Sequence, residues 1–379
     1  MVLRGFLLSE LLESIEDNPI TAILGPRQCG KTTLSKAITH PDFKLHYFDL
    51  EDPRDAFLFE QPMLALEALT GIIIIDEIQL KPALFSLLRV LADKKRENTR
   101  FVILGSASPS LIKGASESLA GRIHFIDMVG FTLTELGSDA QQDLWMRGGF
   151  PLSYLANSET KSINWRNNFI RTFLERDIPQ LGINIPTERL RKFWYMLAHY
   201  HGNILNTSEI GKSLGLSSHT IQHYLDILSG TYMIYLQQPW FENISKRQVK
   251  SPKLFIRDTG LLHALLGLNE KQLVTHPKIG ASWEGFVIEQ LKSKFKDDEM
   301  FFWNTHGGAE LDVLLFRGGK RIGFEIKYSD SPNLSRGSYS AMEDLQLDHL
   351  YVIVPTSKMY PLKDKITVTS LKELIHLSL

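Results

Sequence analysis

One segment restricts the fold more than any other part of the chain: Gly25 to Thr32, which reads Gly-Pro-Arg-Gln-Cys-Gly-Lys-Thr. It follows an apolar run, Ile20 to Leu24, and precedes a helical pattern from Lys31 to Ile38. The pattern GxxxxGK[ST] becomes informative in this context of a strand before and a helix after it. Glycines let backbone N–H groups converge on phosphate oxygens, and the helix dipole adds to the attraction. The segment therefore predicts a phosphate-binding loop in an α/β domain.

The residue types in this loop each suit a task in phosphate binding. Lys31 would reach the β and γ phosphates of ATP, and Thr32 would offer its hydroxyl to Mg²⁺, which prefers oxygen ligands. The alternative, a glycine-rich turn with a buried lysine, is disfavoured because the motif and its context are complete. Residues predicted to bind the cofactors are Gly25, Pro26, Arg27, Gln28, Cys29, Gly30, Lys31, Thr32 and Thr33 for ATP, with Thr32 and Asp76 for Mg²⁺.

A run of four isoleucines that ends in two carboxylates supplies the second half of the predicted site. Ile72 to Ile75 is typical of a buried central strand, and Asp76 and Glu77 follow at its carboxyl end, the edge where ligands bind in open α/β sheets. Asp76 is predicted to hold the metal through water, and Glu77 to polarise the attacking water. An Asp-Glu pair alone is common on protein surfaces. It predicts a catalytic site here because it follows a buried strand and lies downstream of a phosphate-binding loop.

Two further residues of this region are catalytic candidates. Ser106 follows the apolar run Phe101 to Leu104 and is predicted to orient water against the γ phosphate. Arg122 precedes a fifth predicted strand, Ile123 to Met128, and could act as an arginine finger in a neighbouring subunit, which would imply a homo-oligomer. The alternative for Arg122 is a surface salt bridge.

Changes of pattern divide the 379 residues into four predicted parts. Residues 1–135 alternate short strands with helical patterns, as βαβ units around a parallel sheet do, and form the P-loop ATPase domain. Residues 136–202 are a helical linker or lid, 203–258 have the outline of a winged helix, and 259–379 return to a mixed α/β pattern. The fold class is therefore α/β, with a helical and winged-helix segment between two α/β domains.

Composition limits the environment and the partners. The formal net charge of -1 excludes a polycation that coats nucleic acid, so DNA binding would need a local basic face. The single cysteine, Cys29, excludes an intrachain disulfide and fits a reducing compartment, so a cytoplasmic location is expected. The longest apolar run, Gly71 to Ile75, is far shorter than the roughly 20 residues that span a bilayer, so we expect no membrane segment.

Two short helical patterns, Ser208 to Leu214 and Ser217 to Leu228, flank Gly215-Leu216 and predict a helix-turn-helix. The second helix lacks Arg and Lys, which argues against tight base-specific reading, and winged helices also serve as packing modules. DNA is nevertheless the favoured partner because several side chains can contact bases or phosphates. They are Ser218, His219, Gln222 and His223 on the second helix, and a basic cluster of Lys246, Arg247, Lys250, Lys253 and Arg257.

Acidic residues and a lysine recur on neighbouring predicted strands near the end of the chain. Asp312 lies before a Gly318-Gly319 hairpin, and Glu325 and Lys327 share one face of the following strand. The set resembles the active site of the PD-(D/E)xK nuclease fold, in which carboxylates bind Mg²⁺ and the lysine aids the attacking water. Catalytic candidates under this resemblance are Glu284, Asp312, Glu325 and Lys327. The alternatives are surface salt bridges and a nuclease-like fold without its chemistry.

With these motifs the whole chain resembles the prokaryotic AAA-type ATPases that join an N-terminal ATPase domain to an uncharacterised C-terminal domain. The resemblance implies an ATPase with sheet order 5-1-4-3-2 and covers nearly all of the chain. It rests on Gly25 to Thr33, Tyr47-Phe48-Asp49-Leu50-Glu51, Asp76-Glu77-Ile78-Gln79, Gly105-Ser106, Leu119-Ala120-Gly121-Arg122 and Gly148-Gly149-Phe150-Pro151.

The leading hypothesis is an ATP-driven motor or switch that acts on DNA. A second hypothesis is a nucleotide-dependent regulatory protein whose C-terminal domains bind a protein partner without catalysis. A third is a nuclease gated by ATP.

Overall fold

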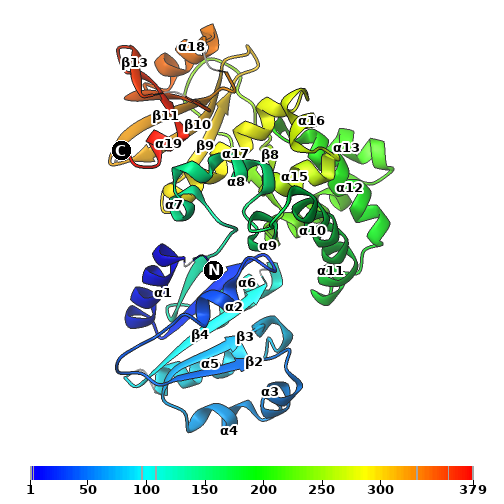
Figure 1. Ribbon diagram of the computed structural model, residues 1–379, viewed down its shortest axis with the longest axis vertical. Coiled ribbons are helices and arrows are strands. Elements are labelled where there is room, and N and C mark those ends of the chain that lie inside the picture. The colour runs from blue at the N-terminus through cyan, green and yellow to red at the C-terminus, as the bar shows by residue number, and fades with distance from the viewer. Residues whose placement is uncertain are drawn as a thin grey trace. The chain divides into compact units, whose positions relative to one another are not determined.

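The computed structural model describes residues 2, 4–94, 97–106, 109–329, 332–356 and 358–377, and of residues 109–113 only the backbone. The chain divides into two compact units, 1–130 with 226–232, and 131–225 with 233–379. Figure 1 gives the labels of their helices and strands.

The first unit is built on five strands connected by helices. Its elements are α1 (Gly5–Asp17), β1 (Ile20–Gly25), α2 (Lys31–Ser35), β2 (Leu45–Asp49), α3 (Pro53–Leu58), α4 (Pro62–Glu67), β3 (Gly71–Asp76), a 3-10 turn (Ile78–Leu80), α5 (Leu84–Lys94), β4 (Thr99–Ser106), α6 (Pro109–Ser118) and β5 (Ile123–Asp127). The strands are all parallel and lie in the order β2-β3-β4-β1-β5 (Figure 1). Read from the other edge this is 5-1-4-3-2, so the sheet order that the resemblance implies is confirmed.

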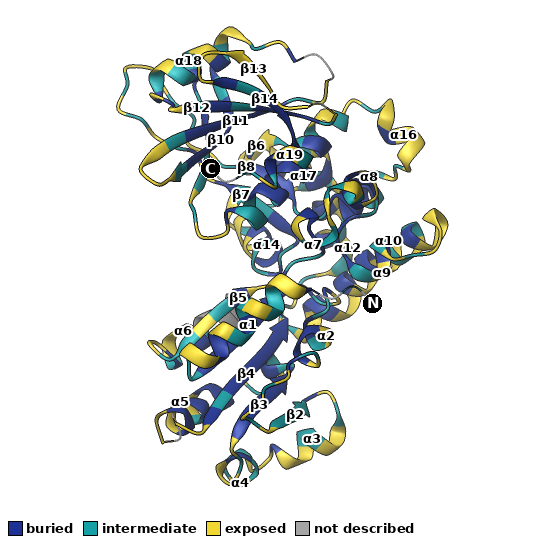
Figure 2. Cartoon of the chain, turned by 60° about the vertical axis from the view of Figure 1, so that its left-hand side comes forward, coloured by how far each residue is buried: buried dark blue, intermediate teal, exposed yellow. Residues whose placement is uncertain are grey.

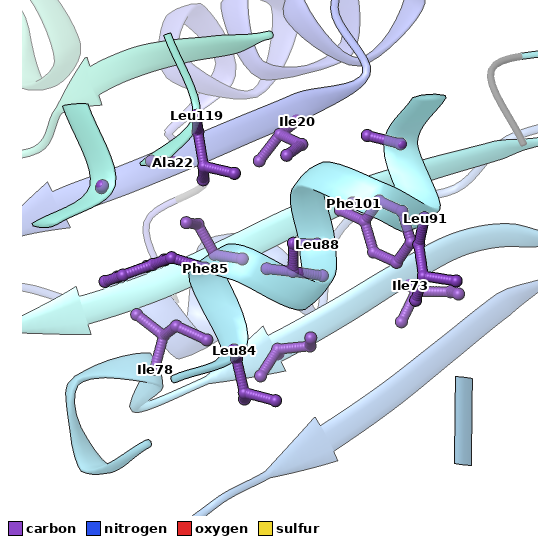
Figure 3. Close-up of a cluster of buried hydrophobic side chains, with 14 of the residues drawn as sticks. Ile20, Ala22, Ile73, Ile78, Leu84, Phe85, Leu88, Leu91, Phe101 and Leu119 are labelled. Carbon is purple, nitrogen blue, oxygen red and sulfur yellow. The ribbon is translucent and has the colours of Figure 1, made fainter. Parts of the chain in front are cut away.

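The three central strands of the first sheet, β3, β4 and β1, are buried on both faces, as their uninterrupted apolar runs predict. Ile73 and Ile75 of β3 pack into one core cluster and Ile72 and Ile74 into the other, since successive side chains of a strand point to opposite faces. Helix α5 covers the first face with Leu84, Phe85, Leu88 and Leu91 (Figure 3), and α1 contributes Leu11 and Ile15 to the second. The two covered faces leave the carboxyl ends of the strands as the edge available to a ligand.

Helix α2 is shorter than the sequence predicts, because it ends at Ser35 and not at Ile38. The N–H groups of Ala37 and Ile38 bond carbonyls three residues back, so the last turn is tighter than an α-helix. His40 stands before Pro41, and a residue before proline disfavours helical backbone angles. The predicted helix from Pro82 to Lys95 is α5, and Lys95 lies outside the described residues.

The second unit begins with helices, as the pattern from Asp143 to His201 predicts. They are α7 (Leu133–Leu136), a 3-10 turn (Ser138–Ala140), α8 (Gln141–Arg147), α9 (Pro151–Tyr154), α10 (Glu159–Thr172), a π-helical turn (Phe173–Asp177), α11 (Ile178–Gln180) and α12 (Thr187–Tyr200).

Gly148 and Gly149 join α8 to α9 and fix this helical part to a distant segment. Gly148 has φ +77°, and a Cβ atom there would lie 2.1 Å from Oδ1 of Asp258. The backbone N–H of Gly149 donates to the same carboxylate at 2.7 Å. Packing against the partly buried Asp258 thus explains the glycine at position 148, and Gly149 contacts the same carboxylate through its backbone.

Gly148→Ala is therefore expected to lower the free energy of unfolding by about 2 kcal/mol or more, because it adds both left-handed strain and a clash. Chemical denaturation of the variant measures this, with Gly182→Ala as the control. Gly182 also has a positive φ, but a Cβ atom there meets nothing within 4 Å. Equal destabilisation by the two substitutions would show that strain alone matters and that Asp258 does not.

A small antiparallel sheet follows α12, with two helices inserted between its strands. The elements are β6 (Asn203–Ile204), α13 (Thr207–Leu214), α14 (Ser218–Gly230), β7 (Ile234–Gln237) and β8 (Lys253–Ile256), in the sheet order β6-β8-β7. The two predicted helices of the helix-turn-helix are present, and the hydroxyl of Ser217 caps the second by accepting from the N–H of Thr220 at 3.1 Å. The two-residue strand β6 is not predicted by the sequence.

The rest of the second unit contains a six-stranded sheet and its helices. These elements are α15 (Thr259–Leu266), α16 (Glu270–Val274), α17 (Ile279–Lys294), β9 (Met300–Asn304), β10 (Glu310–Arg317), β11 (Lys320–Ile326), α18 (Arg336–Asp344), β12 (His349–Val354), β13 (Tyr360–Lys363), β14 (Ile366–Ser370) and α19 (Leu371–Leu374). The order is β13-β14-β12-β11-β10-β9, with β11, β12 and β14 parallel. Burial is densest along the inner strands of this sheet (Figure 2).

Candidate functional site

The pairing of the strands brings the predicted ATP-site residues to one edge of the first sheet. Gly25, at the end of β1, pairs with Ser106 at the end of β4, and Asp49 of β2 pairs with Asp76 at the end of β3. Because all strands are parallel, these positions lie at their carboxyl ends. The loop from Gly25 to Thr32 begins at the same edge.

The phosphate-binding loop is held in place by backbone contacts. A Cβ atom on Gly25 would lie 2.0 Å from the carbonyl oxygen of Met128, so only glycine fits there. The buried guanidinium of Arg4 donates to the carbonyls of Cys29 at 3.3 Å and Val129 at 2.8 Å. Arg4, which no sequence motif marks, therefore links the loop to the chain that follows β5.

Lys31 points into its own loop. Its Nζ donates to the carbonyl oxygens of Gly25 at 3.0 Å and Pro26 at 2.8 Å, and the residue is only 7% exposed. These two carbonyl oxygens occupy the positions around Nζ of Lys31 where phosphate oxygens would bind. Phosphate binding would have to replace two neutral hydrogen bonds by charge-assisted ones, which are stronger.

Asp76 is the centre of a hydrogen-bond network that suits a metal site. Its Oδ2 accepts from the hydroxyls of Thr32 at 2.7 Å and Tyr47 at 2.6 Å, and its Oδ1 accepts from the N–H of Glu77 at 2.9 Å. Burial first, and then the adjacent Asp76 carboxylate, raise the pKa of Tyr47, so its phenol stays protonated and donates. The sequence marked Tyr47 only as part of a family motif, and its contact with Asp76 follows from β2 lying next to β3.

Glu77 has an unusual backbone and a single described side-chain partner. Its φ of 55° places it in the left-handed region, which is uncommon for a residue other than glycine and typical of functional turns. Gln79 donates its amide to the Glu77 carboxylate. Burial raises the pKa of Glu77, while Gln79 and Lys31 oppose that rise. Among the described atoms, Oε1 of Gln79 is buried without a hydrogen-bond partner.

The groups at this edge fit ATP and Mg²⁺. Thr32 and Asp76 place two hard oxygen donors together, the donor type that Mg²⁺ prefers. The hydroxyl of Ser106 is buried and has no hydrogen-bond partner within the described part of the chain. An unsatisfied buried hydroxyl costs free energy, and a bound nucleotide or water could satisfy it.

Arg122 does not belong to the same edge. It directly precedes β5, whose first residue, Ile123, pairs with Ile20 at the start of β1. The guanidinium makes a bidentate ion pair with Asp93, with Nε 2.6 Å and NH2 2.9 Å from the two carboxylate oxygens. Arg122 therefore cannot reach the phosphate loop of its own sheet, and any catalytic role would be exerted on another subunit.

Two of the four nuclease-like candidates of the second unit, Glu284 and Asp312, lie around Lys253, a lysine that the sequence analysis placed in the basic cluster. Nζ of Lys253 lies 3.1 Å from Oε1 of Glu284, 2.5 Å from Oε1 of Glu310 and 3.6 Å from Oδ1 of Asp312. The Lys253 side chain is only 4% exposed. Burial would lower its pKa, but the three carboxylates together raise it, so Lys253 stays charged.

The other half of this cluster joins Asp312 to Glu325 and Lys327. Nζ of Lys327 lies 2.7 Å from Oε1 of Glu325, as alternation on the strand predicts, and Oδ2 of Asp312 accepts from the N–H of Ile326 at 2.8 Å. Burial raises the pKa of Glu325 well above its ordinary value, Asp312 adds to the rise, and Lys327 opposes it. Burial likewise raises the pKa of Glu284, against the effect of Lys253.

The basic cluster between β7 and β8 is not one continuous surface. Lys253 is buried, Lys246 pairs with Asp344 at 2.5 Å, and Arg257 pairs with Glu289 at 2.6 Å. Arg247 and Lys250 are exposed. The backbone of this segment is also engaged, since the N–H of Val249 donates to the carbonyl of Asn304 at 2.9 Å. The expected wing is therefore paired along β9. Three of its five cations are exposed, and one of these three, Lys246, is already paired with Asp344.

The exposed face of α14 agrees with the sequence analysis. Ile221 and Leu225 are fully buried, and the opposite side of the helix is polar. The four predicted residues Ser218, His219, Gln222 and His223 are exposed on that side, and so is Asp226, an acidic residue that the sequence analysis did not include.

Three family models match successive parts of the chain. Residues 17–137 match the family described as AAA domain, 138–272 match Domain of unknown function (DUF8612), and 279–374 match Domain of unknown function (DUF4143). In the described part of the chain, no helix is both long and apolar enough to span a bilayer.

The chain also matches named proteins over most of its length. It is 45% identical to "Uncharacterized protein Rv2008c" of Mycobacterium tuberculosis over 370 residues, which covers 97% of this chain and 83% of that protein. The values are the same for "Uncharacterized protein Mb2031c" of Mycobacterium bovis. A solved structure, the Walker-type ATPase PABY2304 of Pyrococcus abyssi, aligns with a TM-score of 0.48 at 16% identity, covering 70% of this chain and 96% of that one.

Proposed function

We infer that this chain, which belongs to the family of the mycobacterial proteins Rv2008c and Mb2031c, is a Mg²⁺-dependent ATPase. Its residues 17–137 match the AAA domain family. The observation that carries this proposal is the contact of Thr32 with Asp76 at 2.7 Å beside a complete phosphate-binding loop. Two hydroxyl or carboxylate oxygens at a loop of this kind are what a metal-nucleotide complex requires.

Each residue of the site has a role in the proposed reaction. Lys31 exchanges the carbonyls of Gly25 and Pro26 for β and γ phosphate oxygens, while Thr32 and Asp76 hold Mg²⁺ directly or through water. Bound Mg²⁺ neutralises charge on the phosphates. Glu77 accepts a hydrogen bond from the attacking water and polarises it. Ser106, whose hydroxyl at the same edge has no hydrogen-bond partner among the described residues, orients that water or the γ phosphate.

The pH dependence of turnover tests the role of Glu77 as the base. A general base must be ionised, so kcat/KM is expected to fall as the pH drops below the pKa of Glu77. Because burial raises that pKa, the fall should begin at a higher pH than it would for an ordinary glutamate. Gln79→Leu removes the donor that lowers this pKa, so the acidic limb should move to still higher pH. Gln61→Leu, at an exposed glutamine, is the control. An acidic limb that stays in place in Gln79→Leu would contradict the assignment.

Arg122 is proposed to act between subunits of a homo-oligomer. Its position away from the carboxyl-end edge supports action in trans, and its ion pair with Asp93 supports a structural role. Mixing Arg122→Ala and Lys31→Ala subunits separates the two. If Arg122 acts in trans, each variant alone turns over little ATP and the mixture recovers activity. Turnover at the wild-type rate by Arg122→Ala alone would show that Arg122 has no catalytic role and serves only in the ion pair with Asp93.

We propose that the ATPase acts on DNA and that a winged helix in the second unit binds the DNA. The order α12, β6, α13, α14, β7, β8 and the sheet order β6-β8-β7 support this assignment, since a winged helix inserts a helix-turn-helix into a small antiparallel sheet in this way. The exposed polar face of α14 would lie against the duplex, with Arg247 and Lys250 available for phosphates.

Binding to fluorescent double-stranded, single-stranded and branched DNA at two salt concentrations tests this proposal. His219→Glu/His223→Glu adds two negative charges to the exposed face of α14 and should weaken binding about tenfold or more. Asn164→Glu/Asn167→Glu adds the same charge to exposed positions of α10 and should have little effect. Binding that is equal in both variants, or absent in the wild type, would favour a protein partner instead.

A further inference from the structure

The resemblance of the carboxylate cluster at β10 and β11 to a PD-(D/E)xK nuclease site implies a divalent metal, but the charges present do not leave a place for one. Glu284, Glu310, Asp312 and Glu325 come from α17, β10 and β11. Three of these carboxylates, those of Glu284, Asp312 and Glu325, are largely buried, while Glu310 is 41% exposed. The buried ones require a counter-cation, because unpaired buried charges are very costly. In a metal-dependent nuclease that cation would be Mg²⁺.

In this chain the counter-cation is part of the protein. Lys253 enters the cluster from β8 and places one ammonium against Glu284, Glu310 and Asp312, within 3.6 Å of each. Its stem packs beside the ring of Phe302, with Nζ 5.6 Å from the ring centroid. The strand positions of Lys253 fix this contact, since Lys253 pairs with Ile204 on one side and Gln237 on the other.

The remaining carboxylate has its own lysine. Glu325 is paired with Lys327 at 2.7 Å and also accepts from Ser338 at 3.3 Å. Each acidic group of the cluster thus contacts an ammonium or lies within 4 Å of one. Among the described residues, no group of three or more acidic, histidine or cysteine side chains is arranged to hold a metal ion.

We propose that the ammonium of Lys253 occupies the divalent-cation position of this cluster, so that the wild-type protein binds no metal there and the cluster is not a metal-dependent nuclease centre. Lys253 and its carboxylates instead join the strand β8 to α17 and β10. The proposal is independent of ATP hydrolysis in the first unit, and failure of either one leaves the other standing.

Binding of Mn²⁺ to the nucleotide-free protein, measured by electron paramagnetic resonance, tests the proposal. Wild type and Asp312→Asn are expected to bind Mn²⁺ equally, because Asp312 holds no metal in either. Lys253→Ala removes both the charge and the side chain that fills the position. It should gain one Mn²⁺ that binds at least about tenfold more tightly than any Mn²⁺ bound by the wild type, since Glu284, Glu310 and Asp312 then lack their cation. Lys253→Ala/Asp312→Asn should lose that gain.

Two results would overturn the proposal. One is Mn²⁺ binding by the wild type that Asp312→Asn removes, or Mg²⁺-dependent cleavage of DNA with the same sensitivity. The other is a folded Lys253→Ala protein that gains no Mn²⁺. If Lys253→Ala does not fold, the comparison of wild type with Asp312→Asn still decides, because the proposal requires these two to be alike in both assays.

Discussion

Glu77→Gln is expected to lower kcat for ATP by about 10²–10⁴, the usual contribution of a general base, while the Kd for ATP stays nearly unchanged. The amide keeps the shape of the side chain but cannot accept a proton. The hydrogen bond from Gln79 and the left-handed backbone at Glu77 fix where the carboxylate stands, so a substitution of the same size tests charge alone. Steady-state turnover and binding of a fluorescent ATP analogue give the two constants.

Glu60→Gln is the matched control for this substitution, since Glu60 is an exposed glutamate of the same unit. It should leave both constants at their wild-type values. Turnover by Glu77→Gln that equals that of Glu60→Gln would remove Glu77 from the mechanism and leave Asp76 or Ser106 to position the water.

Lys31→Ala is expected to abolish measurable ATP binding, and with it turnover. The ammonium of Lys31 points into the loop, where phosphate oxygens can replace the two backbone carbonyls that it now contacts. The other cation of the loop, Arg27, already forms an ion pair with Glu51 at 2.7 Å. Loss of a charge-assisted contact of about 1.5–3 kcal/mol for each hydrogen bond lowers affinity by one or more orders of magnitude.

Isothermal titration calorimetry with ATP and Mg²⁺ measures the loss, and circular dichroism reports whether Lys31→Ala keeps its fold. Lys44→Ala, which removes an exposed lysine from the same unit, should bind ATP as the wild type does. Retention of wild-type affinity by a folded Lys31→Ala protein would mean that the loop is a glycine-rich turn and binds no nucleotide.

The first sheet could be predicted from the sequence because its signals are local. The isoleucine run of β3 and the apolar run before Gly25 predict where these strands lie and that both of their faces are buried. The loop motif predicts that the site lies at the carboxyl ends of the strands. The contact of Tyr47 with Asp76 could not be predicted from spacing, since it requires β2 to be the neighbour of β3.

Lys253 shows the limit of local reasoning most clearly. It stands in a stretch with Lys246, Arg247, Lys250 and Arg257, and nothing in that stretch distinguishes a buried lysine from a surface one. Its burial depends on carboxylates that lie roughly 30 to 60 residues later and reach it only through the pairing of β8 and the packing of α17.

The short exposed strand β13, with Pro361 inside it, lacks the alternation of apolar and polar residues that predicts a strand, so the sequence analysis does not include it.

Steady-state ATP hydrolysis with Mg²⁺, with and without the three forms of DNA, tests the central claim most directly. The account predicts turnover that requires Mg²⁺, disappears in Lys31→Ala and rises when one form of DNA is added. Turnover that is unchanged in Lys31→Ala, or no turnover by the wild type under any of these conditions, would contradict it.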